Sequence, residues 1–468
     1  MDAAASLALV RALARRLGAE VIEKHISWVL LAGDFAYKLK KPLRLPFVDY
    51  ASAERRRACC EEEVRLNERL APGLYLGVAR ITGSIEEPAI DGDGPALEHA
   101  VRMRRFPPGA LLSERAARGT LDAPLLDRLA RRLGAFHSEA PRREPGDKDL
   151  GERARSALQG ATGLWPAARQ AQLARWIDEE AETVLPLWRT RAAGGHVREG
   201  HGDLHLANLL TLEGEVMAFD AVEFDPALRC IDVVEDIAFT VMDLAAHGLP
   251  ALAWRLLDGW LQHTGEYEGV PGLRLCLAYR ALVRALACQL REPHCADARR
   301  YAAEALRWSA PAQPRLWITH GLPGSGKTWQ SQQLLEAAGA IRLRSDVERK
   351  RLHGLAPLAS SRGNGVDLYT PEATRATYTR LFTLAATLLA AGWPVVLDAA
   401  FLRRGERDEA RALARTWDVP FAIVDCEAPM EVLRERLRTR TGDASEADAR
   451  VLEWLAAARE PLRDEERS

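Results

Sequence analysis

One short segment near the middle of the chain has the residue types that phosphoryl transfer requires. Residues 201–208 read HGDLHLAN, which places Asn208 five positions after Asp203. In phosphoryl-transfer sites with this spacing, the Asp accepts the proton of the attacking hydroxyl and the Asn binds magnesium. A further metal ligand should follow a strand, and the apolar residues 216–219 are followed by Asp220. The spacing predicts Asp203 as the catalytic base and Asn208 and Asp220 as ligands of Mg²⁺.

Such a site also needs a lysine that contacts the nucleotide phosphates and a helical glutamate that holds the lysine. Lys38 and Lys40 lie two residues apart in a strand-like segment, so their side chains share one face. Glu63, within the helical, charge-rich residues 52–70, is the expected partner. We expect Lys38 to bind ATP together with Glu63, with Lys40 as the alternative lysine.

Other polar side chains near this loop are expected to support it. His201 should brace the loop, and His205 either packs within it or contacts the substrate. Asp232 and Asp236 follow the loop in the sequence and are expected to accept hydrogen bonds from its backbone.

A second segment predicts a separate phosphate site. Residues 321–328 read GLPGSGKT, which fits G-x-x-x-x-G-K-[ST], after an apolar strand at 316–320 and before a helical pattern. In this motif backbone N–H groups surround phosphate, Lys327 reaches the β- and γ-phosphates, Thr328 binds Mg²⁺, and the helix dipole favours the anion. The remaining residues expected to bind ATP in this loop are Gly321, Gly324, Ser325 and Gly326.

Acidic residues end the strand-like segments that follow this loop. The segment 341–345 leads into Asp346, and the segment 395–397 leads into Asp398. Strands that alternate with helices predict a parallel sheet, with ligands at the carboxyl ends of its strands. We therefore expect Asp398 to be a second Mg²⁺ ligand.

The surrounding elements predict two domains. Residues 25–105 read as strands and turns around one helix, and the chain is mostly helical after residue 106, except around 201–222. This pattern is typical of an α+β bilobal protein-kinase-like domain, and the second part predicts an α/β P-loop domain with a parallel sheet. The predicted boundaries are 1–308 for the first domain (small lobe about 20–105, large lobe about 106–308), 309–314 for a Pro-containing linker, and 315–468 for the second domain.

The first motif set resembles the aminoglycoside phosphotransferase-like kinases, which include choline, homoserine and sugar kinases. The segments 37–42 and 71–76 are similar to those of a bacterial branch that is often fused to a P-loop kinase. The chain departs from protein kinases because it lacks a G-x-G-x-x-G loop, a D-F-G sequence and an A-P-E sequence. The resemblance therefore implies a small-molecule substrate and argues against a protein substrate.

The second motif set resembles the gluconate, shikimate and polynucleotide 5′-hydroxyl kinases and the zeta-toxin-like kinases. This resemblance implies that Asp346 is the base for the acceptor hydroxyl and that Arg349 binds the substrate. It also implies that Arg436 and Arg440 belong to a lid that closes on the ATP phosphates, although a solvated basic helix face would give the same pattern.

Composition limits the partners and the compartment. The formal net charge of −2 gives no general electrostatic reason to bind nucleic acid or membranes. The N-terminus does not read as a signal peptide, and no stretch of about 18 apolar residues is present. Seven cysteines without a C-x-x-C pair are typical of reduced thiols. We expect a cytoplasmic protein that acts on small molecules, while the sequence leaves its oligomeric state open.

Taken together, the motifs predict a bifunctional phosphotransferase that uses ATP and Mg²⁺. The first domain would phosphorylate a hydroxyl of a sugar-like or amino-sugar-like metabolite, and the second domain would phosphorylate another hydroxyl substrate. One alternative is a nucleotide sensor in which one kinase unit is regulatory. Another is a nucleic-acid 5′-hydroxyl kinase in the second domain, for which the basic patch would comprise Arg342, Arg344, Arg349, Lys350 and Arg351.

Overall fold

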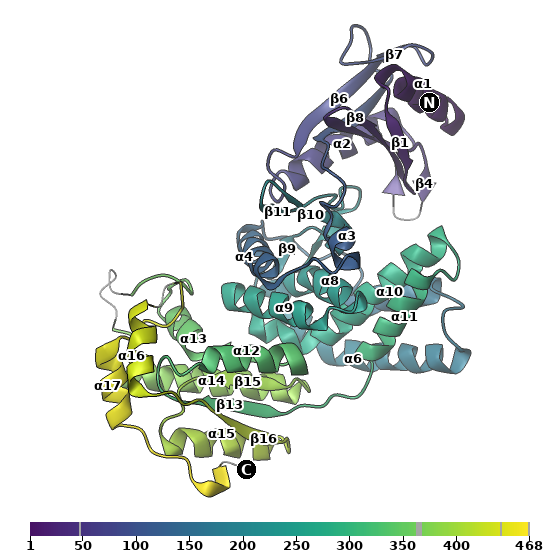
Figure 1. The fold of residues 1–468 in the computed structure, drawn as a ribbon. Coiled ribbons are helices and arrows are strands. Elements are labelled where there is room, and N and C mark those ends of the chain that lie inside the picture. The colour runs from purple at the N-terminus through teal and green to yellow at the C-terminus, as the bar shows by residue number, and fades with distance from the viewer. Residues whose placement is uncertain (46–47, 362–366, 440–441, 467–468) are drawn as a thin grey trace. The chain divides into compact units, whose positions relative to one another are not determined.

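A computed structural model describes residues 1–45, 48–361, 367–439 and 442–466 (Figure 1). The chain divides into two compact units. Unit 1 comprises Met1–Leu121, Phe136–Asp243 and Leu275–Ala305, and unit 2 comprises Asp122–Ala135, Leu244–Arg274 and Leu306–Ser468. The segments 122–135 and 244–274, which we expected in the first domain, therefore lie in the unit that holds the P-loop. The linker predicted at 309–314 stays a prediction.

A six-stranded antiparallel sheet forms the N-terminal part of unit 1, in the order β1-β2-β3-β8-β6-β7. The sequence Ala32-Gly33-Asp34 between two strand-like segments predicts a tight hairpin turn, and the hairpin between β2 and β3 does turn at Gly33, whose φ of +55° suits glycine. The strands are β1 (Glu20–Glu23), β2 (Ser27–Ala32), β3 (Phe35–Lys40), β6 (Tyr75–Gly83), β7 (Pro88–Ile90) and β8 (Glu98–Arg104), and a separate pair is β4 (Arg44–Leu45) with β5 (Val48–Asp49).

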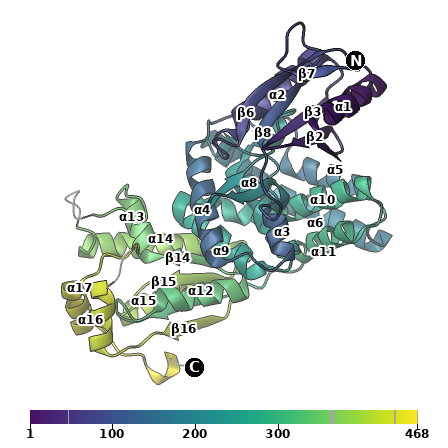
Figure 2. The same ribbon diagram turned by 45° about the horizontal axis from the view of Figure 1, so that its top comes forward.

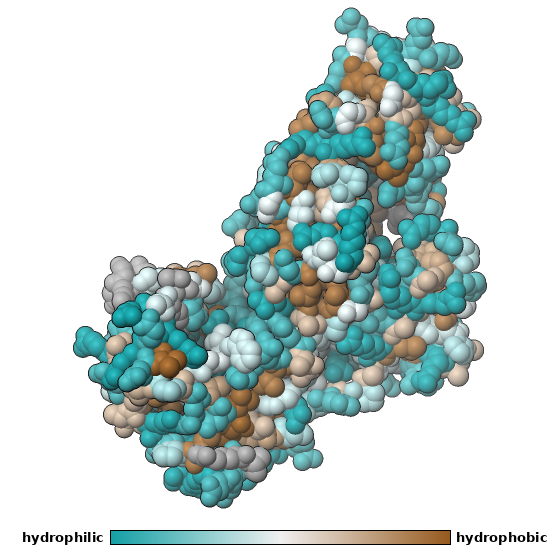
Figure 3. All heavy atoms as spheres, viewed as in Figure 1, coloured by the Kyte–Doolittle hydropathy of each residue, from teal (hydrophilic) through white to brown (hydrophobic). Residues whose placement is uncertain are grey.

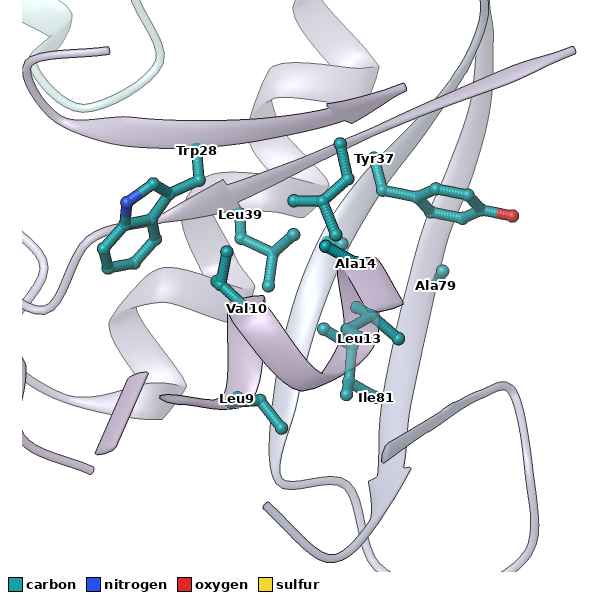
Figure 4. Close-up of a cluster of buried hydrophobic side chains, with 11 residues drawn as sticks. Leu9, Val10, Leu13, Ala14, Trp28, Tyr37, Leu39, Ala79 and Ile81 are labelled. Carbon is teal, nitrogen blue, oxygen red and sulfur yellow. The ribbon is translucent and has the colours of Figure 1, made fainter. Parts of the chain in front are cut away.

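Two helices cover this sheet, α1 (Ala3–Leu17) and α2 (Ala53–Asn67). Helix α1 packs against one face, where Tyr37 and Leu39 of β3 join its apolar side chains in a buried cluster (Figure 4). Because side chains alternate along a strand, Lys38 and Lys40 point to the opposite face. Helix α2 lies against that face and brings Glu63 to both lysines.

The rest of unit 1 is mainly helical and contains two short antiparallel pairs. Strand β9 (Val197–Glu199) pairs with β12 (Cys230–Asp232), and β10 (Leu209–Leu212) pairs with β11 (Glu215–Ala218). The 3-10 turn η1 (Leu206–Asn208) precedes β10. Several helices between residues 112 and 308 carry residues of both units. The helices of this region are α3 (Leu112–Ala117), α4 (Ala123–Glu139), α5 (Leu150–Gly160), α6 (Ala167–Ala193), α7 (Pro226–Arg229), α8 (Val233–Ala246), α9 (Pro250–Thr264), α10 (Leu273–Arg291) and α11 (Ala296–Trp308).

Unit 2 is built on a four-stranded sheet in the order β14-β15-β13-β16. All three pairings in this sheet are parallel, so the parallel sheet that the sequence predicts is confirmed. The register brings the ends of the strands to one edge, because Arg344 lies opposite Asp398 and His320 lies opposite Asp425. The strands are β13 (Leu316–His320), β14 (Ile341–Arg344), β15 (Val395–Asp398) and β16 (Phe421–Asp425).

Helices cover this sheet, and those of the C-terminal part are visible in Figures 1 and 2. They are α12 (Lys327–Ala338), α13 (Ser345–Leu352), α14 (Pro371–Ala390), α15 (Arg404–Thr416), α16 (Met430–Thr439) and α17 (Ala449–Ala457). Helix α9 and the 3-10 turn η2 (Glu266–Gly272) belong to the same unit, and α9 packs against α12 and β14.

Hydrophilic side chains dominate the face drawn in Figure 3, and apolar ones are interspersed among them. Among the described residues, no helix combines the length and the apolar character needed to cross a bilayer.

Candidate active sites

The first candidate site is framed by β3 and α2. The two carboxylate oxygens of Glu63 accept from different lysines, with 2.8 Å to Lys38 Nζ and 2.8 Å to Lys40 Nζ. Lys38 also pairs with Asp220, whereas Lys40 pairs with Glu223. Burial disfavours the charged form of both lysines, but these carboxylates hold the pKa of each well above its ordinary value. Both predicted lysines thus lie at Glu63, and only Lys38 reaches a predicted metal ligand.

The predicted catalytic loop brings Asp203, His205 and Asn208 together. The Asn208 amide donates to Asp203 Oδ2 at 2.9 Å and to the Asp203 carbonyl at 2.9 Å. The ring Nε2 of His205 lies 3.3 Å from Asp203 Oδ2. Burial alone would raise the pKa of Asp203, but His205, Arg284 and His201 together hold it well below its ordinary value. Asp203 is therefore a carboxylate at neutral pH that can accept a hydrogen bond from an acceptor hydroxyl.

Asp220 follows β11 in the left-handed conformation, with φ +64°. Its backbone N–H donates to the Tyr75 hydroxyl at 3.0 Å, and the N–H of Phe219 donates to the Asn208 carbonyl at 2.9 Å. These bonds hold the two predicted metal ligands at adjacent ends of the β10–β11 hairpin. The side chain of Asp220 is 41% exposed, so its carboxylate is open to a ligand.

The donor set of this site suits magnesium. The Asn208 amide nitrogen is engaged with Asp203, which leaves the amide oxygen for a metal ion, and Asp220 adds a carboxylate. Within the part of the chain that the structure describes, no three His, Cys, Asp or Glu side chains are grouped to hold a metal ion. Magnesium is commonly bound by one or two protein oxygens together with substrate phosphates, and this pair could supply such oxygens.

Helix α8 holds the backbone of the predicted catalytic loop. Asp236 accepts from the N–H of His201 at 2.8 Å and of Gly202 at 2.9 Å, as the sequence predicts. The expectation for Asp232 was wrong, because this carboxylate binds the buried Arg191 through bonds of 2.7 and 2.8 Å instead of the loop.

His201 braces the loop from within, as expected. The Asp203 N–H donates to its Nδ1 at 3.3 Å, and its Nε2 lies 3.0 Å from the Phe219 carbonyl. A neutral ring with the proton on Nε2 satisfies both contacts. Burial lowers the pKa of His201, which favours this neutral form.

Further residues of the first site were not singled out from the sequence. Glu223 binds Lys40 and also accepts from the Tyr50 hydroxyl. Asn67 accepts from the Ala221 N–H at 2.9 Å, and Asp243 accepts from the Leu206 N–H at 2.8 Å. Only Glu223 and Asn67 had a sequence signal, since they follow Asp220 and Glu63 by three and four positions. Lys40 of β3 and Asn67 of α2 thereby bond to the segment that follows Asp220.

The second candidate site is the loop between β13 and α12. Gly321 has φ +149°, and a Cβ atom at this position would lie 2.3 Å from the Cys426 carbonyl oxygen, so only glycine fits. Lys327 Nζ donates to the carbonyls of Gly321 and Leu322 at 2.9 Å each. The loop borders a cavity of about 690 Å³, which is large enough for a nucleotide.

The predicted acidic residues meet at this cavity. Asp346, Asp398 and Thr328 all lie in its wall. Asp398 accepts from the Ser331 hydroxyl at 3.1 Å and lies 3.5 Å from Arg344 Nε. The hydroxyl of Thr328 and the carboxylate of Asp398 are the oxygen donors that could bind magnesium beside the phosphates.

The predicted arginines differ in position. Arg349 is buried behind the cavity wall, where it donates to Asp346 Oδ1 at 3.1 Å and lies over the ring of Tyr369. Its direct contact with a substrate therefore stays a prediction. Arg436 lies in the wall and donates to the Gly324 carbonyl at 2.9 Å. Arg440 lies outside the described residues.

The five residues of the predicted basic patch do not form an open basic surface. Arg342 binds Asp258 through a bond of 2.6 Å, and Lys350 lies 3.1 Å from Glu446. The remaining pairs are Arg344 with Asp398 and Asp443, Arg349 with Asp346, and Arg351 with Glu348. A polynucleotide would have to displace carboxylates from each of these cations.

Unit 1 carries a candidate site at Glu63 and the loop of Asp203 and Asn208, and unit 2 carries a second candidate site at the P-loop. Residues 316–462 match the family described as "AAA domain". The chain is 31% identical over 455 residues to "Uncharacterized protein Rv2004c" of Mycobacterium tuberculosis (strain H37Rv) and to "Uncharacterized protein Mb2027c" of Mycobacterium bovis. The matched region covers 94% of this chain and 89% of each relative. The chain belongs to the same family as these mycobacterial proteins.

Two solved structures are similar to separate parts of the chain. A choline kinase from Cryptosporidium parvum Iowa II is 10% identical, covers 64% of this chain and 93% of its own, and gives a TM-score of 0.42. A gluconokinase from Sinorhizobium meliloti 1021 is 23% identical, covers 34% of this chain and 81% of its own, and gives a TM-score of 0.25.

Proposed function

We propose that this protein is a bifunctional ATP-dependent phosphotransferase with one active site in each compact unit. The observation that carries the proposal is the completeness of both residue sets. Unit 1 combines Asp203 and Asn208 with Lys38, Glu63 and Asp220, and unit 2 combines the P-loop with Asp346 and Asp398 around one cavity. The acceptor of the first site is proposed to be a small sugar-like or amino-sugar-like metabolite, and that of the second site another small hydroxyl compound.

In the first site, the residues of this chain position the reactants. Lys38, held by Glu63, would contact the phosphates of ATP, and Asn208 and Asp220 would bind Mg²⁺, which when bound neutralises charge on the transferred phosphoryl group. Asp203 would accept a hydrogen bond from the acceptor hydroxyl and take its proton as the acceptor oxygen bonds to the γ-phosphorus of ATP, while the bond from that phosphorus to the bridging oxygen breaks and ADP leaves. Because the pKa of Asp203 is low, its main contribution is orientation of the hydroxyl in a loose transition state.

In the second site, the P-loop amides and Lys327 would hold the phosphates of ATP, and Thr328 and Asp398 would bind Mg²⁺. Asp346 is proposed to orient the acceptor hydroxyl, and Arg349 holds Asp346 from behind. Arg436, which bonds to the P-loop through Gly324, is placed to approach the phosphates. The described cysteines are free thiols, which supports a reducing cytoplasm as the compartment.

Two variants test the assignment of one activity to each site. Full-length chains with Asp203→Asn or Lys327→Ala are compared with wild type in an ATP-consumption screen against a panel of sugars and other hydroxyl metabolites. Each variant should lose one acceptor activity by about 100-fold or more and keep the other. Full phosphoryl transfer in both variants would show that the two-site proposal is wrong. ATP binding without turnover in one unit would instead identify that unit as a sensor.

A further inference from the structure

Helix α9 presents two polar side chains, one turn apart, to the sheet of the P-loop. Asp258 binds Arg342 through two bonds, 3.2 Å to Nε and 2.6 Å to the terminal nitrogen. Gln262 accepts from Arg344 at 3.1 Å and donates to Asp258 at 2.5 Å. Arg342 and Arg344 are alternate residues of β14, so their side chains lie on one face of the strand, toward Asp258 and Gln262 of α9. Residues 250–264 lie outside the part of the chain that matches the AAA domain family.

The two arginines connect α9 to the predicted magnesium ligands. Arg342 donates to the carbonyl of Thr328 at 3.1 Å and to the Ser331 hydroxyl at 3.2 Å. The same hydroxyl donates to Asp398 at 3.1 Å, and Arg344 lies 3.5 Å from Asp398. A continuous hydrogen-bonded chain therefore runs from α9 through β14 to both residues expected to bind magnesium.

We propose that Asp258 is a positioning residue for the magnesium end of the second site, an inference that rests on the function proposed for that site. Arg342 is 4% exposed and Asp258 is 6% exposed, so the guanidinium depends on this carboxylate for charge compensation. Without it, Arg342 would turn toward the nearby carboxylate of Asp398. Asp258 thereby keeps Asp398 available for the cation and fixes the backbone of Thr328.

The Mg²⁺ requirement of ATP binding tests this role in the full-length chain. A Lys38→Ala background weakens binding at the first site, and calorimetry then measures ATP binding over a range of Mg²⁺ concentrations and in chelator. Asp258→Asn removes the charge at nearly constant shape. We expect the Mg²⁺ concentration for half-maximal binding to rise about tenfold or more, because residues that orient metal ligands commonly contribute that much to metal affinity. Binding of ATP in chelator should change little.

Asp127→Asn is the matched control. Asp127 of α4 binds Arg255 of α9 through bonds of 2.7 and 2.8 Å, so this variant also removes an acidic partner of α9 but leaves the bonds of Arg342 in place. It should leave the Mg²⁺ requirement unchanged. The inference is overturned if Asp258→Asn shifts the requirement no more than Asp127→Asn, or if binding falls equally with and without Mg²⁺. If Lys327→Ala does not weaken ATP binding in this background, the proposed function itself is wrong and the inference fails with it.

A second inference rests on an exposed aromatic side chain. Trp329 follows Thr328 in the first turn of α12 and is 64% exposed. It lies in the wall of the 690 Å³ cavity and is the single aromatic residue among the described residues of that wall. The other wall residues are mainly small or charged, which suits phosphate and acceptor groups but not a planar base.

We infer that Trp329 stacks on the base of the nucleotide whose phosphates the P-loop binds. Trp329→Ala should weaken binding of ATP by about 5- to 100-fold, the usual range for loss of one base–aromatic stack. Binding of inorganic tripolyphosphate, which has no base, should not change. Trp329→Phe should retain most of the ATP affinity, because it keeps an aromatic ring. The measurements use the same Lys38→Ala background.

Trp454→Ala is the control for loss of an exposed indole, because Trp454 is 49% exposed on α17 and lies outside the cavity wall. It should affect neither ligand. Equal weakening of ATP and tripolyphosphate by Trp329→Ala, or no weakening of either, would overturn the inference. The parent chain is also compared with its Lys327→Ala variant. If Lys327→Ala weakens the binding of neither ATP nor tripolyphosphate, the function proposed for this site is wrong, and the stacking role is excluded with it.

Discussion

Two lysines share one glutamate in the first site, and their other partners separate their roles. Lys38 joins Glu63 to Asp220, whose carboxylate is 41% exposed. Lys40 joins Glu63 to Glu223, and its side chain is 1% exposed. Lys38 therefore lies beside an exposed carboxylate, which favours it as the predicted nucleotide lysine, whereas Lys40 compensates two buried carboxylates.

Replacing each lysine separately tests this division. Lys38→Ala should lower ATP turnover at the first site by about 100-fold with a small loss of stability, because Glu63 keeps Lys40 as a partner. Lys40→Ala leaves Glu223 without its cation and should destabilise unit 1 by about 3–5 kcal/mol. Turnover is measured in a Lys327→Ala background, and stability by urea unfolding. The reverse pattern, in which Lys40→Ala removes turnover from a fully stable protein, would make Lys40 the nucleotide lysine.

The Cβ atom that Gly321→Ala would add gives a prediction for the second site. Gly321→Ala would place Cβ 2.3 Å from the Cys426 carbonyl oxygen, so the loop must move away from its phosphate-binding shape. ATP affinity at this site should fall by about tenfold or more, while the first site stays active. Gly405→Ala is the control, because nothing lies within 4 Å of the added Cβ and a helical alanine should stabilise by about 0.5–1 kcal/mol. Unchanged ATP affinity in Gly321→Ala would contradict this account of the loop.

At the scale of elements, the predicted catalytic loop depends on hydrogen bonds that only a neutral His201 and an ionised Asp236 provide. Burial lowers the pKa of His201. Burial alone would raise the pKa of Asp236, but His137, His201 and the loop amides hold it below its ordinary value. Both groups bind protons more readily in the unfolded chain, so stability of this element falls as pH falls.

Hydrogen exchange of the segment 199–209 checks this pH dependence. After correction for intrinsic exchange rates, the free energy of opening should decrease as pH falls below about 6.5, the ordinary pKa of His201, and decrease further below about 4 through Asp236. His201→Asn should be less stable at pH 7 but show a flatter dependence between pH 7 and 5. An equally steep dependence in His201→Asn would assign the effect to other groups.

Elements with local signals were the ones that the sequence could predict. The loop at 201–208, the β2–β3 hairpin and the P-loop each depend on residues a few positions apart, and the structure has all three. The pairing of Lys40 with Glu223 was not predictable in the same way, because Glu223 comes 183 positions after Lys40 and its closeness to Asp220 in the sequence does not reveal this partner. Asp232 is the opposite case. Its closeness to the loop in the sequence suggested a contact with the loop, but Asp232 binds Arg191 instead.

At the scale of the molecule, the assignment of helices to units was beyond the sequence. Helix α9 is amphipathic and follows α8 directly, so its pattern does not reveal which sheet it covers. The structure packs it on β14 and α12, where Trp254 contacts Trp308 and Trp393 in edge-to-face pairs at 5.9 and 5.8 Å. Local spacing predicts the chemistry of each site, but the choice of a packing surface depends on contacts between distant segments.

The excised segment 309–468 tests whether the P-loop fold is independent of α9, as the predicted domain boundary implies. Excision removes Trp254 and exposes Trp393, which is 2% exposed in the full chain and donates to the Val270 carbonyl at 3.1 Å. It also removes Asp258, so Arg342 loses its carboxylate partner, and it uncovers the face of β14 on which α9 packs. The segment should therefore unfold at a lower temperature than unit 2 in the full chain and bind ATP more weakly. An excised segment that melts and binds ATP like the full chain would instead support a boundary at 309–314.

In the full chain, Trp254→Ala should destabilise unit 2 by about 3–5 kcal/mol, whereas the exposed Trp454→Ala should change its stability by less than about 0.5 kcal/mol.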